Sequence, residues 1–176
     1  MPGTLYAKMN LLLRECSANP GQALDELAAS VVQKGYHEFV VSRRVDDHLV
    51  QEQCHEATIR RILYVLSDLG LVLINGGCTL SSRGTSALTD YPNVLGQALL
   101  EYLQRVYGVG LTSIKDAILR VKMVRGSDVP SAAQIFGQLQ SGRVLKQPMS
   151  EERFSTWLNL LARCGVLTSY FRKYYW

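Results

Sequence analysis

The sequence lacks long apolar segments, catalytic signatures and a large excess of charge of either sign. Its apolar stretches are far shorter than the roughly 18–20 residues of a membrane-spanning helix, and no signal peptide is visible. The chain contains no glycine-rich phosphate loop, no G-x-S-x-G sequence and no pair of carboxylates in an apolar setting. We therefore expect a soluble cytoplasmic protein with no membrane contact, no enzymatic activity and no cofactor.

Cysteine is scarce, and its spacing is irregular. The four cysteines are Cys16, Cys54, Cys78 and Cys164. They form no C-x-x-C pair and match no zinc-binding pattern. His48, Cys54 and His55 lie close in sequence, but a fourth ligand and the usual ligand spacing are missing. We predict no metal site and four reduced, mostly buried thiols, as is usual in the cytosol.

What is present fits a folded globular protein of modest basic charge. Of the 176 residues, 47% are hydrophobic and 19% are charged. The length suits one medium domain or two small domains of about 80–90 residues. The net charge of +4 permits nucleic-acid binding but does not require it.

One segment of the chain occurs twice. Residues 55–73 read HEATIRRILYVLSDLGLVL, and residues 150–168 read SEERFSTWLNLLARCGVLT. When Gly70 is aligned with Gly165, the apolar positions of the two segments coincide. Each copy reads as an amphipathic helix that ends at a glycine and continues into a β-prone stretch. The repeat predicts two related modules, residues 1–90 and 94–176, separated by the turn-forming sequence around residues 90–93.

Periodicity and turn residues predict a mainly helical chain. Helices are predicted over residues 4–17, 20–34, 45–53, 55–69, 82–88, 94–107, 112–124, 131–140 and 150–164. Asn19 is expected to cap the second of these helices, with Pro20 at its first position. Short strands are expected at 71–74 and 78–80 around an Asn-Gly-Gly turn. Residues 36–44 form either a small strand or a buried connector, and a single strand is favoured for the last nine residues.

The order helix, helix, helix, Gly-Leu, strand, turn, strand resembles the winged-helix superfamily. The segment DDHLVQEQCHEATIRRILYVLSDLGLVLINGGCTLSSRG is similar to the second helix, recognition helix and wing of MarR-, PadR- and ArsR-like proteins. The resemblance covers residues 20–90 and, in the second half, the repeat helix with its exit at 165–167. It implies an α+β fold that is mainly α with small β wings, as two tandem winged-helix-like modules packed on one another. Residues 45–53 would then be helix 2.

This resemblance implies double-stranded DNA as the partner. The outward faces of the two repeat helices would lie in the major groove, and nearby arginines would hold phosphates. The expected DNA-binding residues are Thr58, Arg60, Arg61, Tyr64, Arg43, Arg44, Arg153, Thr156 and Asn159. The protein would be a transcriptional regulator or the DNA-binding subunit of a larger system, and would be nucleoid-associated. The alternative for Arg60 and Arg61 is a solvated face with no ligand.

A second function fits the same resemblance, because tandem winged helices also act as protein-assembly adaptors without contacting DNA. The expected wing tip at 75–77 carries no cation, although a DNA-binding wing usually presents one. The C-terminus is aromatic, and its candidate partner-binding residues are Tyr170, Phe171, Tyr174, Tyr175 and Trp176. These side chains either pack on the second module or meet a protein partner or a second copy of the chain.

Overall fold

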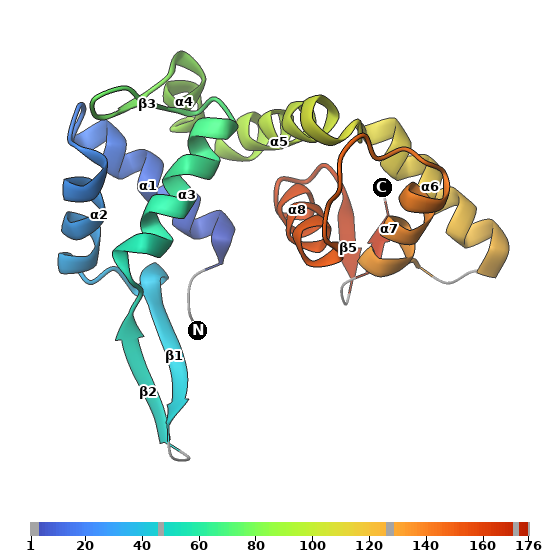
Figure 1. The fold of residues 1–176 in the computed structure, drawn as a ribbon, viewed down its shortest axis with the longest axis horizontal. Helices are drawn as coiled ribbons and strands as arrows, with labels where there is room; N and C mark the ends of the chain where they lie inside the picture. Colours follow the sequence, from blue (N-terminus) through green and yellow to red (C-terminus); the bar gives the residue numbers. More distant parts are fainter. Residues whose placement is uncertain (1–3, 46–47, 126–128, 171–172, 176) are drawn as a thin grey trace. The chain divides into compact units, whose positions relative to one another are not determined.

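The computed structural model describes residues 4–45, 48–125, 129–170 and 173–175. The chain divides into two compact units, Met1–Tyr91 and Pro92–Trp176. Each unit is mainly helical and carries short antiparallel strand pairs (Figure 1). None of the described helices is both long enough and apolar enough to cross a membrane.

The first unit is built on three helices. Its elements are α1 (Leu5–Ala18), α2 (Leu24–Gln33), η1 (His37–Phe39), β1 (Val40–Val45), β2 (His48–Gln53), α3 (Glu56–Asp68), β3 (Val72–Ile74), β4 (Cys78–Leu80) and α4 (Ser82–Ala87). Helices α1, α2 and α3 pack against one another through fully buried side chains such as Leu12, Leu27 and Leu63. Helix α4 follows the β3–β4 hairpin, and the Ser81 hydroxyl caps it by accepting from the Gly84 N–H.

Gln22, in the connection between α1 and α2, forms a β-bridge with Cys78, and the second helix therefore starts later than predicted. The Cys78 N–H donates to the Gln22 carbonyl at 2.8 Å, and the Gly21 N–H donates to the Cys78 carbonyl at 2.9 Å. Gly21 has a φ of +81°, a conformation that favours glycine. The predicted cap at Asn19 is therefore wrong. Asn19 instead ends α1, and α2 begins at Leu24 because Gly21 turns the chain and Gln22 pairs with Cys78 of β4.

Strands β1 and β2 form a hairpin that extends away from the helices of the first unit (Figure 1). We call this hairpin, Val40–Gln53, the arm; its register pairs Val40 with Gln53 and Val45 with His48. The predicted helix over 45–53 is wrong, whereas the strand alternative for 36–44 is correct from Val40 onward. The segment is rich in β-branched valine, which suits a strand, and its cross-strand pairing is invisible to helical periodicity.

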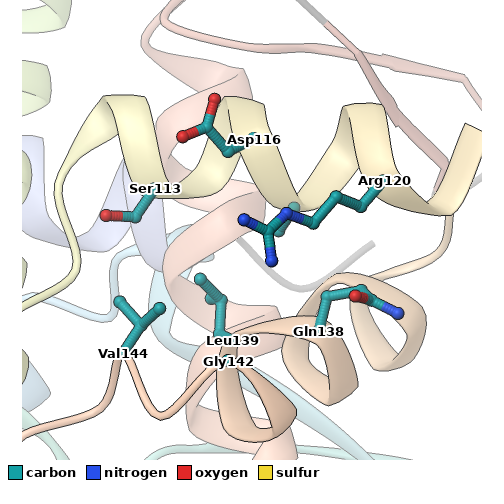
Figure 2. Close-up of a pocket in the computed structure, with 8 residues that line it drawn as sticks. Ser113, Asp116, Arg120, Gln138, Leu139, Gly142 and Val144 are labelled. Atoms are coloured by element: carbon teal, nitrogen blue, oxygen red, sulfur yellow. The ribbon is translucent and has the colours of Figure 1, made fainter.

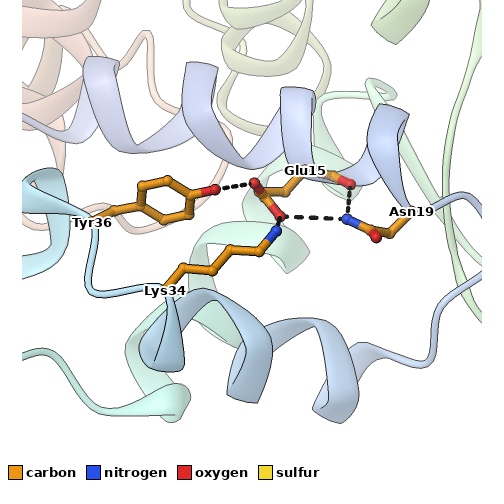
Figure 3. Close-up of polar contacts among 4 residues, drawn as sticks. All are labelled: Glu15, Asn19, Lys34 and Tyr36. Carbon is orange, nitrogen blue, oxygen red and sulfur yellow. Dashed lines mark hydrogen bonds and ion pairs between the residues drawn. The ribbon is translucent and has the colours of Figure 1, made fainter.

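A buried carboxylate fixes the base of the arm to α1 (Figure 3). Glu15 is only 7% exposed and accepts hydrogen bonds from the Tyr36 hydroxyl and from Lys34 Nζ, the latter at 2.5 Å. The Asn19 amide donates to the Glu15 backbone carbonyl at 3.1 Å and to Oε2 at 3.4 Å. Hydrogen bonding to Glu15 raises the pKa of Lys34 and the pKa of Tyr36 above their ordinary values. The cluster joins α1 to the residues that lead from α2 into β1.

The second unit repeats this plan without an arm. Its elements are α5 (Tyr91–Tyr107), α6 (Leu111–Arg125), α7 (Ala132–Ser141), α8 (Glu151–Arg163), β5 (Thr168–Tyr170) and β6 (Lys173–Tyr175). Helix α7 packs on both α6 and α8, and the rings of Phe136 and Phe154 lie 5.4 Å apart between their centroids. Ser131 and Gln134 form a capping box at the start of α7, and the Ser150 side chain caps α8.

The chain ends in a hairpin and not in the predicted single strand. Thr168 pairs with Tyr175, and Tyr170 pairs with Lys173, so a two-residue connection is enough to reverse the chain. Tyr174 is fully buried, and its hydroxyl donates to Asn159 Oδ1 at 2.6 Å. Its N–H donates to the Pro130 carbonyl at 2.9 Å, which ties the hairpin to the segment before α7. Tyr174 is therefore a core residue, which corrects its assignment to a partner-binding surface.

The two repeat helices end in the same way. Gly70 and Gly165 have φ values of +71° and +76°. The N–H of the residue after each glycine bonds back to the last turn: Leu71 to Leu66 at 2.9 Å, and Val166 to Leu161 at 3.0 Å. This is the Schellman arrangement, in which a left-handed glycine satisfies the last carbonyls and turns the chain out of the helix. The sequence repeat is thus also a repeat of backbone geometry.

Candidate nucleic-acid interface

The outward face of α3 carries little free positive charge. The residues exposed along it are Ala57, Arg61, Tyr64 and Asp68. Arg60 lies on the flank: its Nη1 is 2.8 Å from Asp25 Oδ1 on α2 and 3.3 Å from Glu56 Oε2. Two carboxylates therefore compete with any phosphate or base for this guanidinium. Within the described residues Arg61 has no ion-pair partner, and Tyr64 beside it is 53% exposed.

Among the other DNA-binding residues predicted on the first unit, the structure describes the side chain of Thr58. Thr58 is half-buried in the first turn of α3. Arg43 and Arg44 belong to β1, but their side chains lie outside the part of the structure that is described. The structure therefore leaves Arg61 exposed beside Tyr64, pairs Arg60 with Asp25 and Glu56, and does not place the two arm arginines.

The outward face of α8 in the second repeat corresponds to the outward face of α3 in the first. Its exposed residues are Glu152, Thr156, Asn159 and Arg163. The Thr156 hydroxyl donates to the Glu152 carbonyl at 2.9 Å, and the Asn159 side-chain oxygen accepts from Tyr174. Arg153 lies beside this face, where its Nη1 donates to the Tyr107 hydroxyl at 3.2 Å. Predicted residues Arg153, Thr156 and Asn159 are thus all on one side of α8, and Arg163, which helical periodicity also places on the outward side, is exposed with them.

Two further cations lie in the connection between α7 and α8, a segment in which the sequence predicts no helix or strand. Arg143 is exposed and has a φ of +52° directly after α7, at a position where glycine is favoured. Lys146 is also exposed, and its N–H donates to the Tyr107 carbonyl at 2.9 Å. Tyr107 therefore holds Lys146 through its backbone and Arg153 through its hydroxyl, which brings both cations near the start of α8.

The charges of the two units have opposite sign. Residues 1–91 contain eight Lys and Arg and ten Asp and Glu, a net charge of −2. Residues 92–176 contain eleven Lys and Arg and five Asp and Glu, a net charge of +6. The excess positive charge of the whole chain therefore belongs to the second unit. Counting charge separately for the two predicted modules gives this signal from the sequence alone.

The hairpins that follow the two repeat helices also differ in charge, and the hairpin of the second unit is the more basic. In the first unit, β3 and β4 are joined by Asn75, Gly76 and Gly77, which carry no charge. In the second, the sequence joining β5 to β6 includes Arg172, and β6 begins with Lys173. Arg172 and Phe171 lie outside the described residues, as do Trp176 and the side chains of Tyr170, Lys173 and Tyr175.

The described residues give no sign of metal or thiol chemistry. Within 4–45, 48–125, 129–170 and 173–175, no three His, Cys, Asp or Glu side chains cluster as a metal site would require. All four cysteines are free and buried, as predicted. Burial raises the pKa of every thiol, to about 12 for Cys16 and Cys164, so these groups stay protonated at neutral pH.

The comparisons with known proteins add no assignment. The chain matches no protein-family model, no curated protein and no solved structure. Any function must therefore be argued from the residues and geometry described above.

Proposed function

We propose that the protein binds double-stranded DNA and that its second unit makes the main contact. The observation that carries this proposal is the net charge of +6 on residues 92–176, compared with −2 on residues 1–91. Affinity for duplex DNA comes largely from cations that neutralise phosphates, so the basic unit is favoured as the binding unit. The protein would act as a transcriptional regulator or as the DNA-binding subunit of a larger system.

The order of elements in the second unit supports a winged-helix mode of binding. Helices α6, α7 and α8 are followed by the β5–β6 hairpin, with the hairpin tied back to the residues before α7. In this mode α8 is the recognition helix in the major groove, and the hairpin is the wing along the phosphate backbone. Asn159 and Thr156 would then face base edges, while Arg163 and Arg153 lie on either side of them.

The phosphate contacts proposed for this unit flank α8 in the sequence. Arg143 and Lys146 lie in the connection that precedes the helix, and Arg172 and Lys173 belong to the wing sequence that follows it. Cations at these points position a recognition helix without reading sequence. The unusual backbone of Arg143 fits such a role, because a glycine there would relieve the backbone but would remove a charge.

The first unit is the weaker DNA candidate. Arg61 and Tyr64 remain predicted contacts on α3, but Arg60 is paired with Asp25 and Glu56. The hairpin after α3 also lacks a cation at its turn. These features lower the phosphate affinity of the unit, so we assign it a secondary role in DNA binding.

The test compares matched double variants in the two units. Binding of a labelled random duplex of about 30 base pairs is followed by fluorescence anisotropy at about 50 and about 200 mM salt. We expect Arg143→Gln with Lys146→Gln to weaken binding at least about tenfold and to reduce its salt dependence. Arg60→Gln with Arg61→Gln should change affinity by no more than about threefold, since one of these arginines is already paired.

Two outcomes would change this proposal. Loss of binding in the Arg60 and Arg61 variant alone would move the recognition helix to α3. No binding of the wild-type protein at the lower salt concentration would remove DNA as the partner.

The second candidate function is a protein-assembly adaptor that does not contact DNA. The first unit favours it, because it is net acidic and because large hydrophobic side chains are exposed among its described residues. They are Val41, Val50, Tyr64 and Leu73. Aromatic and aliphatic side chains exposed on an acidic surface suit a protein partner better than phosphate. This alternative predicts that the anisotropy experiment shows no binding at either salt concentration.

A further inference from the structure

Helix α6 is apolar on its outward face as well as on its inward face. Ile114, Ile118 and Val121 are buried against the rest of the unit. Outside this buried stripe Leu119 is 41% exposed, Met123 is 82% exposed and Val124 is 78% exposed. Single exposed hydrophobic residues are ordinary, but three within six residues of one helix make a contiguous patch of the kind that marks an interaction surface.

Two opposite charges lie within this patch. Asp116 and Arg120 are one helical turn apart on α6, and both are exposed. Within the described residues, neither has an ion-pair partner. Figure 2 shows the Asp116 carboxylate and the Arg120 guanidinium directed to different sides of α6. The face therefore offers one free acid and one free base beside three exposed apolar side chains.

A hollow lies next to the patch, between α6 and the end of α7 (Figure 2). Its volume is about 120 Å³, and Ala117, Leu139 and Val144 contribute apolar lining. Ser113, Asp116, Arg120 and Gln138 form its polar lining. A hollow of this size with a partly apolar lining can receive one protruding side chain.

We propose that α6 is a self-association surface, on which the α6 helices of two copies pack antiparallel across a two-fold axis near residue 118. In this arrangement residue 116 of each copy faces residue 120 of the other, so two Asp116–Arg120 ion pairs form. Residue 113 faces residue 123, so Met123 of each copy enters the hollow beside Ser113 of the other. Leu119 of the two copies meets near the axis.

The self-complementary charge pattern is what identifies the occupant as a second copy. A two-fold axis presents the same surface twice, and an acid and a base on either side of that axis then pair twice. Phosphate binding alone would not account for this face, because Asp116 and three exposed apolar side chains lie beside Arg120. One helix pair buries less area than a standard interface of about 1,200–2,000 Å², so we expect reversible, micromolar association.

The inference does not depend on DNA binding, although the two fit together. Self-association through α6 would give one particle two copies of α8, and therefore two DNA half-sites related by the same axis. Its test uses oligomeric state without DNA, so it can fail while the proposed function holds, and the reverse is also true.

Sedimentation velocity of the full chain from about 5 to about 200 µM tests the proposal, since micromolar association lies within that range. The wild type should shift from monomer to dimer as concentration rises. Asp116→Arg and Arg120→Asp should each weaken self-association at least about tenfold, because each brings like charges together twice. An equimolar mixture of the two variants should form a heterodimer, and the doubly substituted chain should regain association to within about threefold.

Controls distinguish self-association through this surface from nonspecific hydrophobic association. Met123→Ser should also weaken association, whereas Leu73→Ser, at an exposed hydrophobic residue of the first unit, should have no effect. All substituted side chains are exposed, and far-UV circular dichroism verifies that each variant is folded. A wild type that stays monomeric throughout, or a dimer that is indifferent to both charge reversals, would overturn the proposal.

Discussion

The two units of this chain share one order of helices and strands but have different surfaces. Each has a helix, a short extended segment, two further helices and a hairpin tied back to the extended segment. The first unit is acidic and inserts the arm between α2 and α3, while the second is basic and joins α7 to α8 by residues 142–150. The difference shows that a shared core leaves the surface free to specialise, so function must be argued unit by unit.

The units also differ in what holds the hairpin to the extended segment. In the second unit Tyr174 fills the core and bonds to Pro130 and Asn159; in the first, Cys78 makes the bridge to Gln22. We expect Tyr174→Ala to destabilise the second unit by about 4 kcal/mol, because it empties a fully buried aromatic site. Tyr174→Phe should cost only about 1 kcal/mol, the value of one hydrogen bond.

Urea unfolding followed by hydrogen exchange resolves the two units in the Tyr174 variants. Loss of protection should be confined to residues 92–176. Equal loss of protection in the first unit would show that the two units do not unfold separately.

The Glu15 cluster is specific to the first unit, where it holds the base of the arm. Replacing Glu15 by Ala leaves the Tyr36 hydroxyl and the Lys34 ammonium without their shared acceptor. We expect a loss of about 2–3 kcal/mol in the first unit, at the lower end for a broken ion pair because Lys34 is partly exposed. The exposed Glu26→Ala is the matched control and should cost less than about 0.5 kcal/mol. Similar unfolding midpoints for both variants would contradict this role.

The same cluster predicts a pH dependence. The pKa of Lys34 and the pKa of Tyr36 are both raised in the folded protein, chiefly by hydrogen bonding to Glu15. A group with a raised folded pKa contributes stability that is present below its unfolded pKa and is lost as pH rises through the folded value. These groups should therefore contribute their full stabilisation to the first unit near neutral pH, and its stability should fall above about pH 10. Urea midpoints of wild type and Glu15→Ala should converge there.

The acidic residues at the start of α8 test whether the charge difference between the two units determines DNA affinity. Glu151 and Glu152 complement the helix dipole but lie beside the proposed phosphate contacts. Replacing both by Gln should tighten DNA binding about two- to fivefold at low salt and cost up to about 1 kcal/mol of stability. Glu56→Gln in α3 is the counterpart in the first unit and should change DNA affinity less. Unchanged or weaker binding in the Glu151 and Glu152 variant would count against α8 as the DNA-facing helix.

The smallest expected effect is that of replacing the glycine that ends each repeat helix, and it tests whether the two helix ends are equivalent. A Cβ added at Gly70 or at Gly165 meets no atom within 4 Å, so only the left-handed backbone penalises alanine. Gly70→Ala and Gly165→Ala should each destabilise their own unit by about 1 kcal/mol and by similar amounts. Thermal unfolding of the two variants measures this, and a difference above about 1 kcal/mol would show that the two helix ends are not equivalent.

Local features were predictable wherever neighbouring residues decide the structure. The repeat helix predicted over 55–69 is α3 at Glu56–Asp68, and Ser150 caps α8 through a hydrogen bond from the Arg153 N–H at 3.2 Å. The Asn-Gly-Gly turn and the closing helix at Ser82–Ala87 are also correct. The arm was missed, because an acidic pair before an apolar stretch reads equally well as a helix start or as a turn between strands.

In the candidate site, too, some features follow from the local sequence and others only from tertiary packing. The sequence places Arg60 and Arg61 together on one helix, but only tertiary packing brings Asp25 to Arg60 and leaves Arg61 exposed. Arg143 and Lys146 were missed because loop residues carry no periodic signal. Their position near α8 follows from the end of α7 and from the contact with Tyr107.

The sequence by itself determined the amphipathic helices, the glycines that end them, the internal repeat and the opposite charges of the two halves. Each of these depends on composition or on residues within about one or two helical turns of one another. Only the tertiary structure decided the Gln22–Cys78 bridge, the pairing of β1 with β2 and the burial of Tyr174. These features join residues far apart in the chain, and their stability comes from burial and pairing, which local sequence does not encode.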